Sequence, residues 1–173
     1  MKLITKVKNN ISNHRFPFIL VITIIATILI GCYVTEHYVQ LCVTKGDSMK
    51  PALENGQRFV IKKFDVKPKR YDIVTIKNSN SERIVKRVYG LPNETIQLVV
   101  GRDKISILID GKEIEDKYTT ANLYAPYTAA NPIKLGSDEY FVMGDNRLIS
   151  CDSRFKEIGI ISKKMITGTC IVK

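Results

Sequence analysis

The chain has 173 residues, of which 45% are apolar, and a formal net charge of +10. This length gives room for one domain with its own core and argues against a second catalytic domain. The two histidines, His14 and His37, lie next to an apolar segment near the N-terminus, and the four cysteines form no C-x-x-C pair. We therefore expect no metal site and no other cofactor. Nucleic-acid binding is also disfavoured, because the basic residues are scattered.

The apolar segment runs from Phe16 to Val34, nineteen residues without a charge. That is about the length that crosses a hydrocarbon layer of roughly 30 Å as a helix. A cleavable secretion signal would have a shorter apolar part followed by small residues, which are missing after Cys32. A buried core helix is the other alternative, but so long an unbroken apolar run with no polar face argues against it. We therefore predict a transmembrane anchor at 16–34.

The charges on either side of this anchor predict its orientation. Lys2, Lys6, Lys8 and Arg15 precede it without any acidic residue. The positive-inside rule therefore predicts a cytoplasmic tail at 1–15 and an extracytoplasmic domain at 35–173, in a single-pass protein of the plasma membrane. Residues 16–173 hold 23 basic and 17 acidic side chains, an excess that favours an anionic lipid surface. Solubility alone would explain the same excess.

The pattern after the anchor predicts a mostly β domain. Short runs rich in β-branched and aromatic residues alternate with turn residues, and Asn55-Gly56 and Asp110-Gly111 are typical of hairpin turns. We expect an irregular excursion at 117–136 and a solvated loop at 78–81. Among Cys42, Cys151 and Cys170, a disulfide and three free thiols both remain open. The predicted strands are 57–62, 71–77, 84–91, 95–100, 104–109, 139–143 and 166–172.

Three polar clusters interrupt this β pattern. The first, GDSMKPAL, places Ser48 between a glycine and a proline, which fits either an exposed nucleophile or an ordinary turn. The second, RIVKRVYGLP, places Lys86 and Arg87 on opposite faces of a strand. If Lys86 faces the apolar side, burial lowers its pKa and makes it a general base. Otherwise it is an edge-strand lysine that discourages aggregation.

The third cluster, GDNRLISCDSR, follows the strand predicted at 139–143. Its dense Asp, Asn, Ser and Arg residues predict a loop held by its own hydrogen bonds and by an Asp–Arg pair, with either a structural or a functional role. Because no histidine follows residue 37, a Ser-His-Asp triad cannot form in this domain. A serine nucleophile would need another base, and lysine is the known variant.

Together the clusters GDSMKPAL, YDIVTIK, RIVKRVYGLP and GDNRLISCDSR resemble, in order, the successive sequence boxes of bacterial type I signal peptidases of the compact Gram-positive type. The resemblance implies a signal-peptidase-like β domain and a Ser48/Lys86 dyad. Ser150 matches a hydroxyl that orients the lysine, and the backbone N–H of Ser48, with Gly46, matches the oxyanion site. The resemblance also implies that Asp145, Asp152 and Arg154 support the structure of the site. It implies that Met49, Leu53, Ile84 and Val85 line pockets for small side chains.

The resemblance implies an activity: removal of N-terminal signal peptides from exported preproteins at small-x-small sites. Pilus or surface-protein subunits are further candidate substrates. The chain departs from the family pattern at Ala52, Asn93-Glu94 and Ile149, and residues 154–159 form a longer segment than usual. The alternative is a non-proteolytic assembly factor for exported or pilus subunits on the same scaffold. A pure binder would not need Ser48, Lys86 and Ser150 together.

Overall fold

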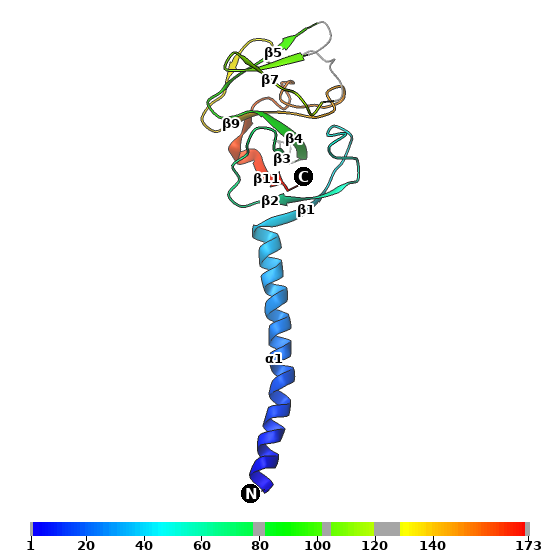
Figure 1. The fold of residues 1–173 in the computed structure, drawn as a ribbon, viewed down its shortest axis with the longest axis vertical. Coiled ribbons are helices and arrows are strands. Elements are labelled where there is room, and N and C mark those ends of the chain that lie inside the picture. The colour runs from blue at the N-terminus through cyan, green and yellow to red at the C-terminus, as the bar shows by residue number, and fades with distance from the viewer. Residues whose placement is uncertain (1, 78–81, 102–104, 120–128, 172–173) are drawn as a thin grey trace. The chain divides into compact units, whose positions relative to one another are not determined.

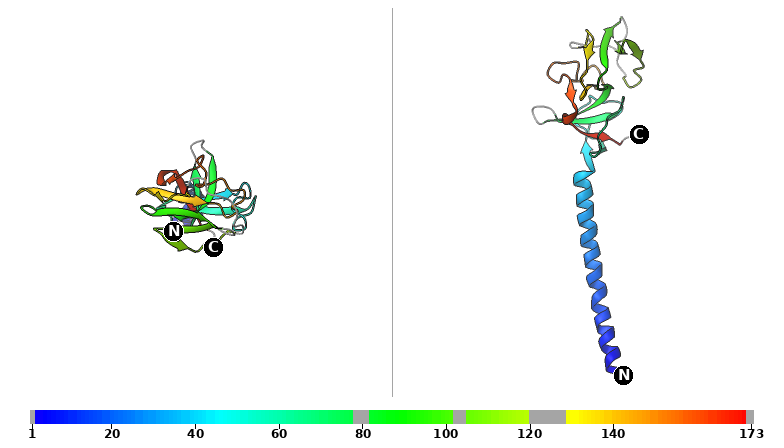
Figure 2. Two further views of the ribbon diagram at one scale, coloured as in Figure 1. Left: turned by 90° about the horizontal axis from the view of Figure 1, so that it is seen from above. Right: turned by 90° about the vertical axis from the view of Figure 1, so that its left-hand side faces the viewer.

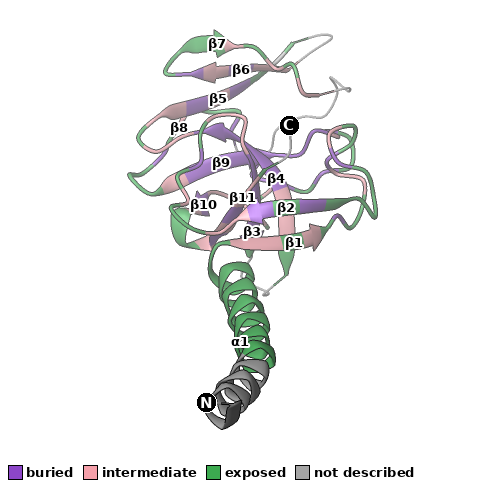
Figure 3. Ribbon diagram, turned by 60° about the horizontal axis from the view of Figure 1, so that its bottom comes forward, coloured by how far each residue is buried: buried purple, intermediate pink, exposed green. Residues whose placement is uncertain are grey.

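The protein consists of one long helix and a β-rich unit. The computed structural model describes residues 2–77, 82–101, 105–119 and 129–171, and it divides into two compact units, Met1–Val39 and Gln40–Lys173. The first unit is the helix α1 (Lys2–His37), blue in Figure 1. It extends beyond the predicted span at both ends. Its segment Phe16–His37 has a mean hydropathy of 2.6, is long enough to cross a membrane, and exposes its side chains (Figure 3).

The second unit contains two antiparallel sheets, which the two views of Figure 2 show from further directions. The larger sheet has the order β1-β2-β11-β3-β4-β9-β10, and the smaller has the order β7-β6-β5-β8. This confirms the mostly β class with one N-terminal apolar helix. The bounds are β1 Val39–Val43, β2 Arg58–Lys62, β3 Ile73–Lys77, β4 Arg83–Gly90, β5 Thr95–Val100, β6 Ile105–Ile109, β7 Lys112–Ile114, β8 Ile133–Lys134, β9 Glu139–Met143, β10 Ile161–Ser162 and β11 Ile166–Cys170, with a 3-10 turn at Lys163–Met165.

Each predicted strand corresponds to a strand in the structure. β5 and β9 have the predicted bounds, and the other predicted strands differ by one or two residues in the part of the chain that is described. Asp110 and Gly111 both have positive φ, 49° and 78°, and form the predicted tight turn between β6 and β7. Gly56 has a φ of 79°, but it lies in a longer connection from β1 to β2.

Four strands were not predicted: β1, β7, β8 and β10. β8 and β10 have only two residues each, too few to show a period of two. β1 follows the apolar span directly, so its Val-Gln-Leu-Cys-Val run has no turn signal before it. The irregular excursion predicted at 117–136 is wrong at β8, which pairs with β5. Residues 120–128 of that excursion, and the loop predicted at 78–81, lie outside the described residues.

Strand β4 is the centre of this architecture. It pairs with β3 on one side and β9 on the other, and Val88 and Tyr89 are completely buried on its two faces. Val88 packs with β3, β9 and β11, whereas Tyr89 packs against the smaller sheet through Ile96 and Leu98. A third apolar cluster includes Met49, Leu53 and Phe59 and anchors the loop that follows β1. The purple segments of Figure 3 show this burial.

Gly168→Ala tests the packing of the larger sheet. A Cβ at this position in β11 would lie 2.9 Å from both Ile61 Cδ1 and the Lys62 carbonyl oxygen, and the latter belongs to a paired strand and cannot move freely. We expect the substitution to lower the free energy of unfolding by about 1–3 kcal/mol in urea titrations of the purified protein. Gly31→Ala in α1, where nothing lies within 4 Å, is the control. Equal midpoints for the two variants would contradict this account.

Candidate active site

Ser48 lies in a tight loop between β1 and β2. Met49 and Leu53 follow it and are completely buried, and Leu53 N–H donates to the Met49 carbonyl oxygen at 2.9 Å. On the other side, Gly46 has a φ of 87° and donates its N–H to Asn55 Oδ1 at 3.0 Å. Apolar anchors and a side-chain hydrogen bond thus fix the chain on both sides of the serine.

Lys86 contacts this serine from β4. Its Nζ lies 2.8 Å from Ser48 Oγ, within hydrogen-bonding distance. Lys86 is only 4% exposed, and its neighbour Arg87 is 5% exposed although the two side chains point to opposite faces. Both are buried because β4 lies inside the sheet with both of its faces covered. The alternation of the strand therefore places one cation at the serine and the other on the far side.

Burial and the charges of the loop after β9 together determine the pKa of Lys86. Burial lowers the pKa of Lys86 below its ordinary value, because a charged ammonium is poorly solvated there. The Asp152 carboxylate acts in the opposite direction, while the Arg154 guanidinium lowers the pKa further. Asp152 and Arg154 form an ion pair at 2.8 Å, so the negative charge nearest the lysine has its own counter-ion. Burial therefore outweighs the carboxylate, and the pKa remains lowered.

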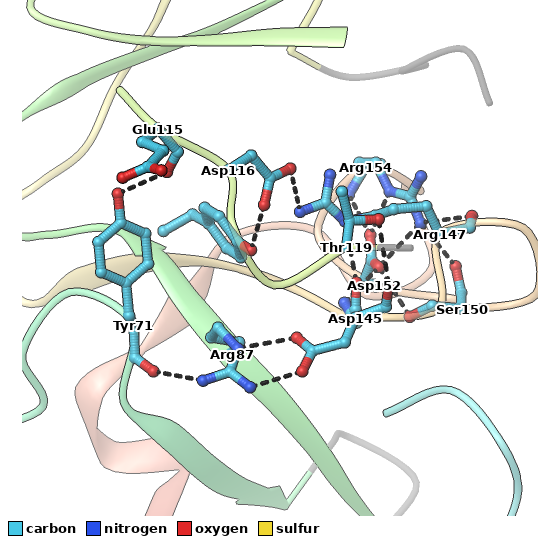
Figure 4. A network of polar contacts seen from close by, with 12 residues as sticks. Tyr71, Arg87, Glu115, Asp116, Thr119, Asp145, Arg147, Ser150, Asp152 and Arg154 are labelled. Carbon is cyan, nitrogen blue, oxygen red and sulfur yellow. Dashed lines mark hydrogen bonds and ion pairs between the residues drawn. The ribbon is translucent and has the colours of Figure 1, made fainter. Parts of the chain in front are cut away.

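The loop that follows β9, residues 144–154, is organised around Asp152. This carboxylate is completely buried and accepts hydrogen bonds from Gly144 N–H (2.8 Å), Ser150 Oγ (2.7 Å) and Arg154 Nε (2.8 Å). Figure 4 shows the cluster. Three donors around one carboxylate hold the loop in a single conformation. Ser150, the residue that the resemblance assigns to lysine orientation, thus donates its hydroxyl hydrogen to Asp152.

The same loop contacts Ser48 directly. Asn146 N–H donates to the Ser48 carbonyl oxygen at 3.0 Å. Gly144 packs so closely that a Cβ there would lie 2.2 Å from Ser150 Oγ and 2.6 Å from the Ser48 carbonyl oxygen. Only a glycine fits at this point. Sequence reasoning identified the cluster that contains Gly144 and Asn146 but gave neither residue a role, because their partners lie about a hundred positions away.

Asp145 joins this loop to the far side of β4. Its carboxylate accepts two hydrogen bonds from Arg87, from Nε at 2.8 Å and from a terminal nitrogen at 2.5 Å. Arg87 donates a third to the Tyr71 carbonyl oxygen at 2.9 Å, and its guanidinium lies 3.9 Å from the Tyr118 ring centroid. Bidentate pairing of this kind fixes orientation as well as distance. The strand that carries Lys86 is therefore tied to the loop that contacts Ser48.

A cavity of about 330 Å³ opens beside the Ser48 and Lys86 side chains. Ser48, Met49, Ile84, Val85 and Lys86 line it, together with residues of β1. Leu53, the fourth residue that the resemblance assigns to the pocket, lies in the apolar cluster behind Met49 and not in the cavity wall. A cavity of this size with mostly apolar walls has room for small apolar groups.

Among the described residues, which include all four cysteines, no disulfide forms, and this decides between the two possibilities left open by the sequence. Within the described ranges, no three His, Cys, Asp or Glu side chains gather as metal ligands would.

Sequence reasoning missed a second group of polar residues in Figure 4, centred on Asp116 and Arg147. Arg147 is 2% exposed on its side chain, pairs with Asp116 at 2.7 Å and donates from Nε to the Gly144 carbonyl oxygen at 2.9 Å. Arg147 belongs to the third polar cluster, GDNRLISCDSR, but no role was predicted for it. Asp116 follows β7 with no motif around it, so no local signal could have identified it.

Comparison with known proteins places this chain in a family. The family model described as signal peptidase, peptidase S26, matches residues 15–173. A signal peptidase I of Bacillus amyloliquefaciens is 34% identical over 87% of this chain and 81% of its own length. Signal peptidase I T of Bacillus subtilis strain 168 is 35% identical over 87% and 79%.

A further relative and one solved structure were also found. A signal peptidase I of Bacillus licheniformis is 32% identical over 92% of this chain and 88% of its own length. The crystal structure of a signal peptidase I of Enterococcus faecalis V583 covers 60% of this chain and 97% of its own, with 28% identity and a TM-score of 0.47. With a family model that matches nearly the whole chain and relatives above 30% identity, this chain belongs to the signal peptidase I family, peptidase S26.

Proposed function

We propose that this serine endopeptidase removes signal peptides from exported preproteins with Ser48 as nucleophile and Lys86 as general base. The observation that carries the proposal is the 2.8 Å contact between Lys86 Nζ and Ser48 Oγ at a buried position. A neutral amine at this distance can accept the serine proton as Oγ attacks the scissile carbonyl carbon. The ammonium so formed then donates that proton to the leaving amine, and water hydrolyses the ester with Lys86 again as base.

The backbone N–H of Ser48 is the proposed oxyanion donor. It has no acceptor among the described residues, whereas the Gly46 N–H is already donated to Asn55 Oδ1. A preorganised donor of this kind contributes about 3–4 kcal/mol to transition-state stabilisation. Gly46 is the second candidate that the resemblance suggests, and its engaged N–H makes its contribution the smaller of the two.

The surrounding residues have supporting roles in this proposal. Ser150 acts on Lys86 through Asp152, which accepts its hydrogen bond, and Arg154 neutralises that carboxylate. Asp145 holds the loop 144–154 against β4 through Arg87. Met49, Ile84 and Val85 receive the small side chains before the cut, with Leu53 packed behind Met49.

The helix α1 is the proposed membrane anchor, with its basic N-terminal residues in the cytoplasm and the β-rich unit outside. Exported precursors reach the enzyme in the bilayer, so the chain acts as a single-pass protein of the plasma membrane. Preproteins with small residues before the cut are the expected substrates, and pilus or surface subunits are a further set to test. A purely binding assembly factor would not require a buried amine against a serine.

The dyad is tested by cleavage of a lipid-reconstituted preprotein with an A-x-A site. We expect Ser48→Ala and Lys86→Ala each to reduce kcat/KM by about a thousandfold or more, because each removes one half of a unit. Lys112→Ala, which changes an exposed lysine of β7, is the control and should cleave like wild type. Precursor binding without cleavage by wild type would favour the assembly-factor alternative.

The pH dependence of cleavage tests the state of Lys86. Only the neutral amine acts as a base, so activity rises as pH increases through the pKa of Lys86. Burial lowers that pKa, and we therefore expect the acid limb of the kcat/KM profile well below the ordinary lysine value of about 10.4. Initial rates from pH 5 to 11 on one precursor measure it. A limb at the ordinary lysine value would show that the amine is solvated and contradict the proposal.

Gly144→Ala tests the contact between the loop and the nucleophile. The new Cβ would overlap the Ser150 hydroxyl and the Ser48 carbonyl oxygen, so it must displace one of them. Because misplacing a reactive group by about 1 Å costs about a hundredfold in rate, we expect a loss of that order in kcat. Gly136→Ala, whose Cβ would meet only the flexible Glu139 side chain, is the matched control. Full activity of Gly144→Ala would remove the loop from the mechanism.

A further inference from the structure

Asp116 lies just beyond the smaller sheet, in the segment 115–119 that follows β7. Its carboxylate is largely buried, with 13% of the side chain exposed. Oδ1 accepts a hydrogen bond from the Tyr89 hydroxyl at 2.7 Å, and Oδ2 forms an ion pair with Arg147 at 2.7 Å (Figure 4). Further along the same segment, Thr119 Oγ1 donates to the Asp145 carbonyl oxygen at 3.2 Å, so this segment also contacts the loop 144–154.

The two partners of Asp116 belong to the two elements that meet at the dyad. Tyr89 is on β4, three residues after Lys86. Arg147 is in the loop 144–154 and donates from Nε to the carbonyl oxygen of Gly144, the residue packed against Ser48 and Ser150. The Arg147 guanidinium lies 5.0 Å from the Tyr89 ring centroid, so the three side chains form one contiguous cluster.

We propose that Asp116 is a positioning residue that holds the loop 144–154 against β4 and thereby sets the distance from Lys86 to Ser48. The inference rests on the proposed function, because it assumes that these two side chains react. Arg147 is almost completely buried, and a buried guanidinium without a carboxylate is strongly disfavoured. Without Asp116, Arg147 must turn toward solvent, and the carbonyl group of Gly144 loses its donor.

A loosened loop changes the environment of Lys86 as well as its position. The charged and titratable groups that act on this amine are Asp152, Cys151, Arg154 and Asp145, and all four lie on the loop. Displacement of the loop admits water, which weakens the desolvation of the ammonium and raises the pKa of Lys86. Removal of a negative charge alone would lower that pKa, so the direction of the change separates positioning from a through-space charge effect.

The experiment compares Asp116→Ala, Asp116→Asn and Asp116→Glu in the full chain in lipid, with Glu115→Gln as the matched control. Glu115 is exposed, and the Tyr71 hydroxyl donates to its backbone carbonyl oxygen, which the control keeps. We expect Asp116→Ala to reduce kcat by about ten- to a hundredfold with KM within about twofold. Its acid limb should shift to higher pH, Asp116→Glu should restore part of the rate, and Asp116→Asn should lie between Ala and Glu.

Hydrogen exchange measured by mass spectrometry provides a readout that needs no activity. We expect faster exchange in 144–151 for Asp116→Ala than for Glu115→Gln, with β9 unchanged. Unchanged exchange, or a lower rate with an unmoved pH profile, would reduce Asp116 to a structural residue and overturn the inference. If wild type cleaves no precursor while the loop still loosens, the positioning contact is real and the proposed function fails.

Discussion

The central constraint on this site is that one lysine amine is buried inside a β-sheet. An ammonium at the position of Lys86 is poorly solvated, and no carboxylate of the described residues forms an ion pair with it. Asp152, the carboxylate that acts most strongly on its pKa, is paired with Arg154 and accepts a hydrogen bond from Ser150. Burial therefore lowers the pKa of the amine, and the hydroxyl of Ser48 is the hydrogen-bonding partner that remains. Much of the unit can be understood as support for this unfavourable placement.

That support comes from ionic contacts around the dyad. Arg87 with Asp145, Arg154 with Asp152 and Arg147 with Asp116 are pairs in which both side chains are largely buried. Buried pairs of this kind add little net stability compared with apolar residues of the same size, but they fix geometry, because breaking one leaves an uncompensated charge. In this protein they connect β4, the loop after β9 and the segment after β7. Lys86 Nζ and Ser48 Oγ lie 2.8 Å apart beside these connected elements.

The sequence predicted much of this, and the failures have physical causes. The apolar span, the mostly β class and the strands that carry the site were visible because period and turn chemistry are local signals. Polar clusters that interrupt the β pattern pointed to Ser48, Lys86 and the loop of Asp152. The two-residue strands β8 and β10 are too short for a pattern. Asp116 and the steric role of Gly144 depend on contacts between distant segments, and no spacing along the chain encodes those.

Burial of β4 on both faces limits the sequence changes that this unit tolerates. Val74 of β3 is paired with Lys86, and Ile73 with Arg87. A slip of one residue in this ladder would exchange the two cations and turn a guanidinium toward Ser48. Arginine remains protonated at any physiological pH, so the exchanged site could not accept a proton, although composition and net charge would be unchanged. The hydrogen-bond register between β3 and β4 therefore decides which cation contacts Ser48, and insertions near these strands are tolerated only where their pairing is kept.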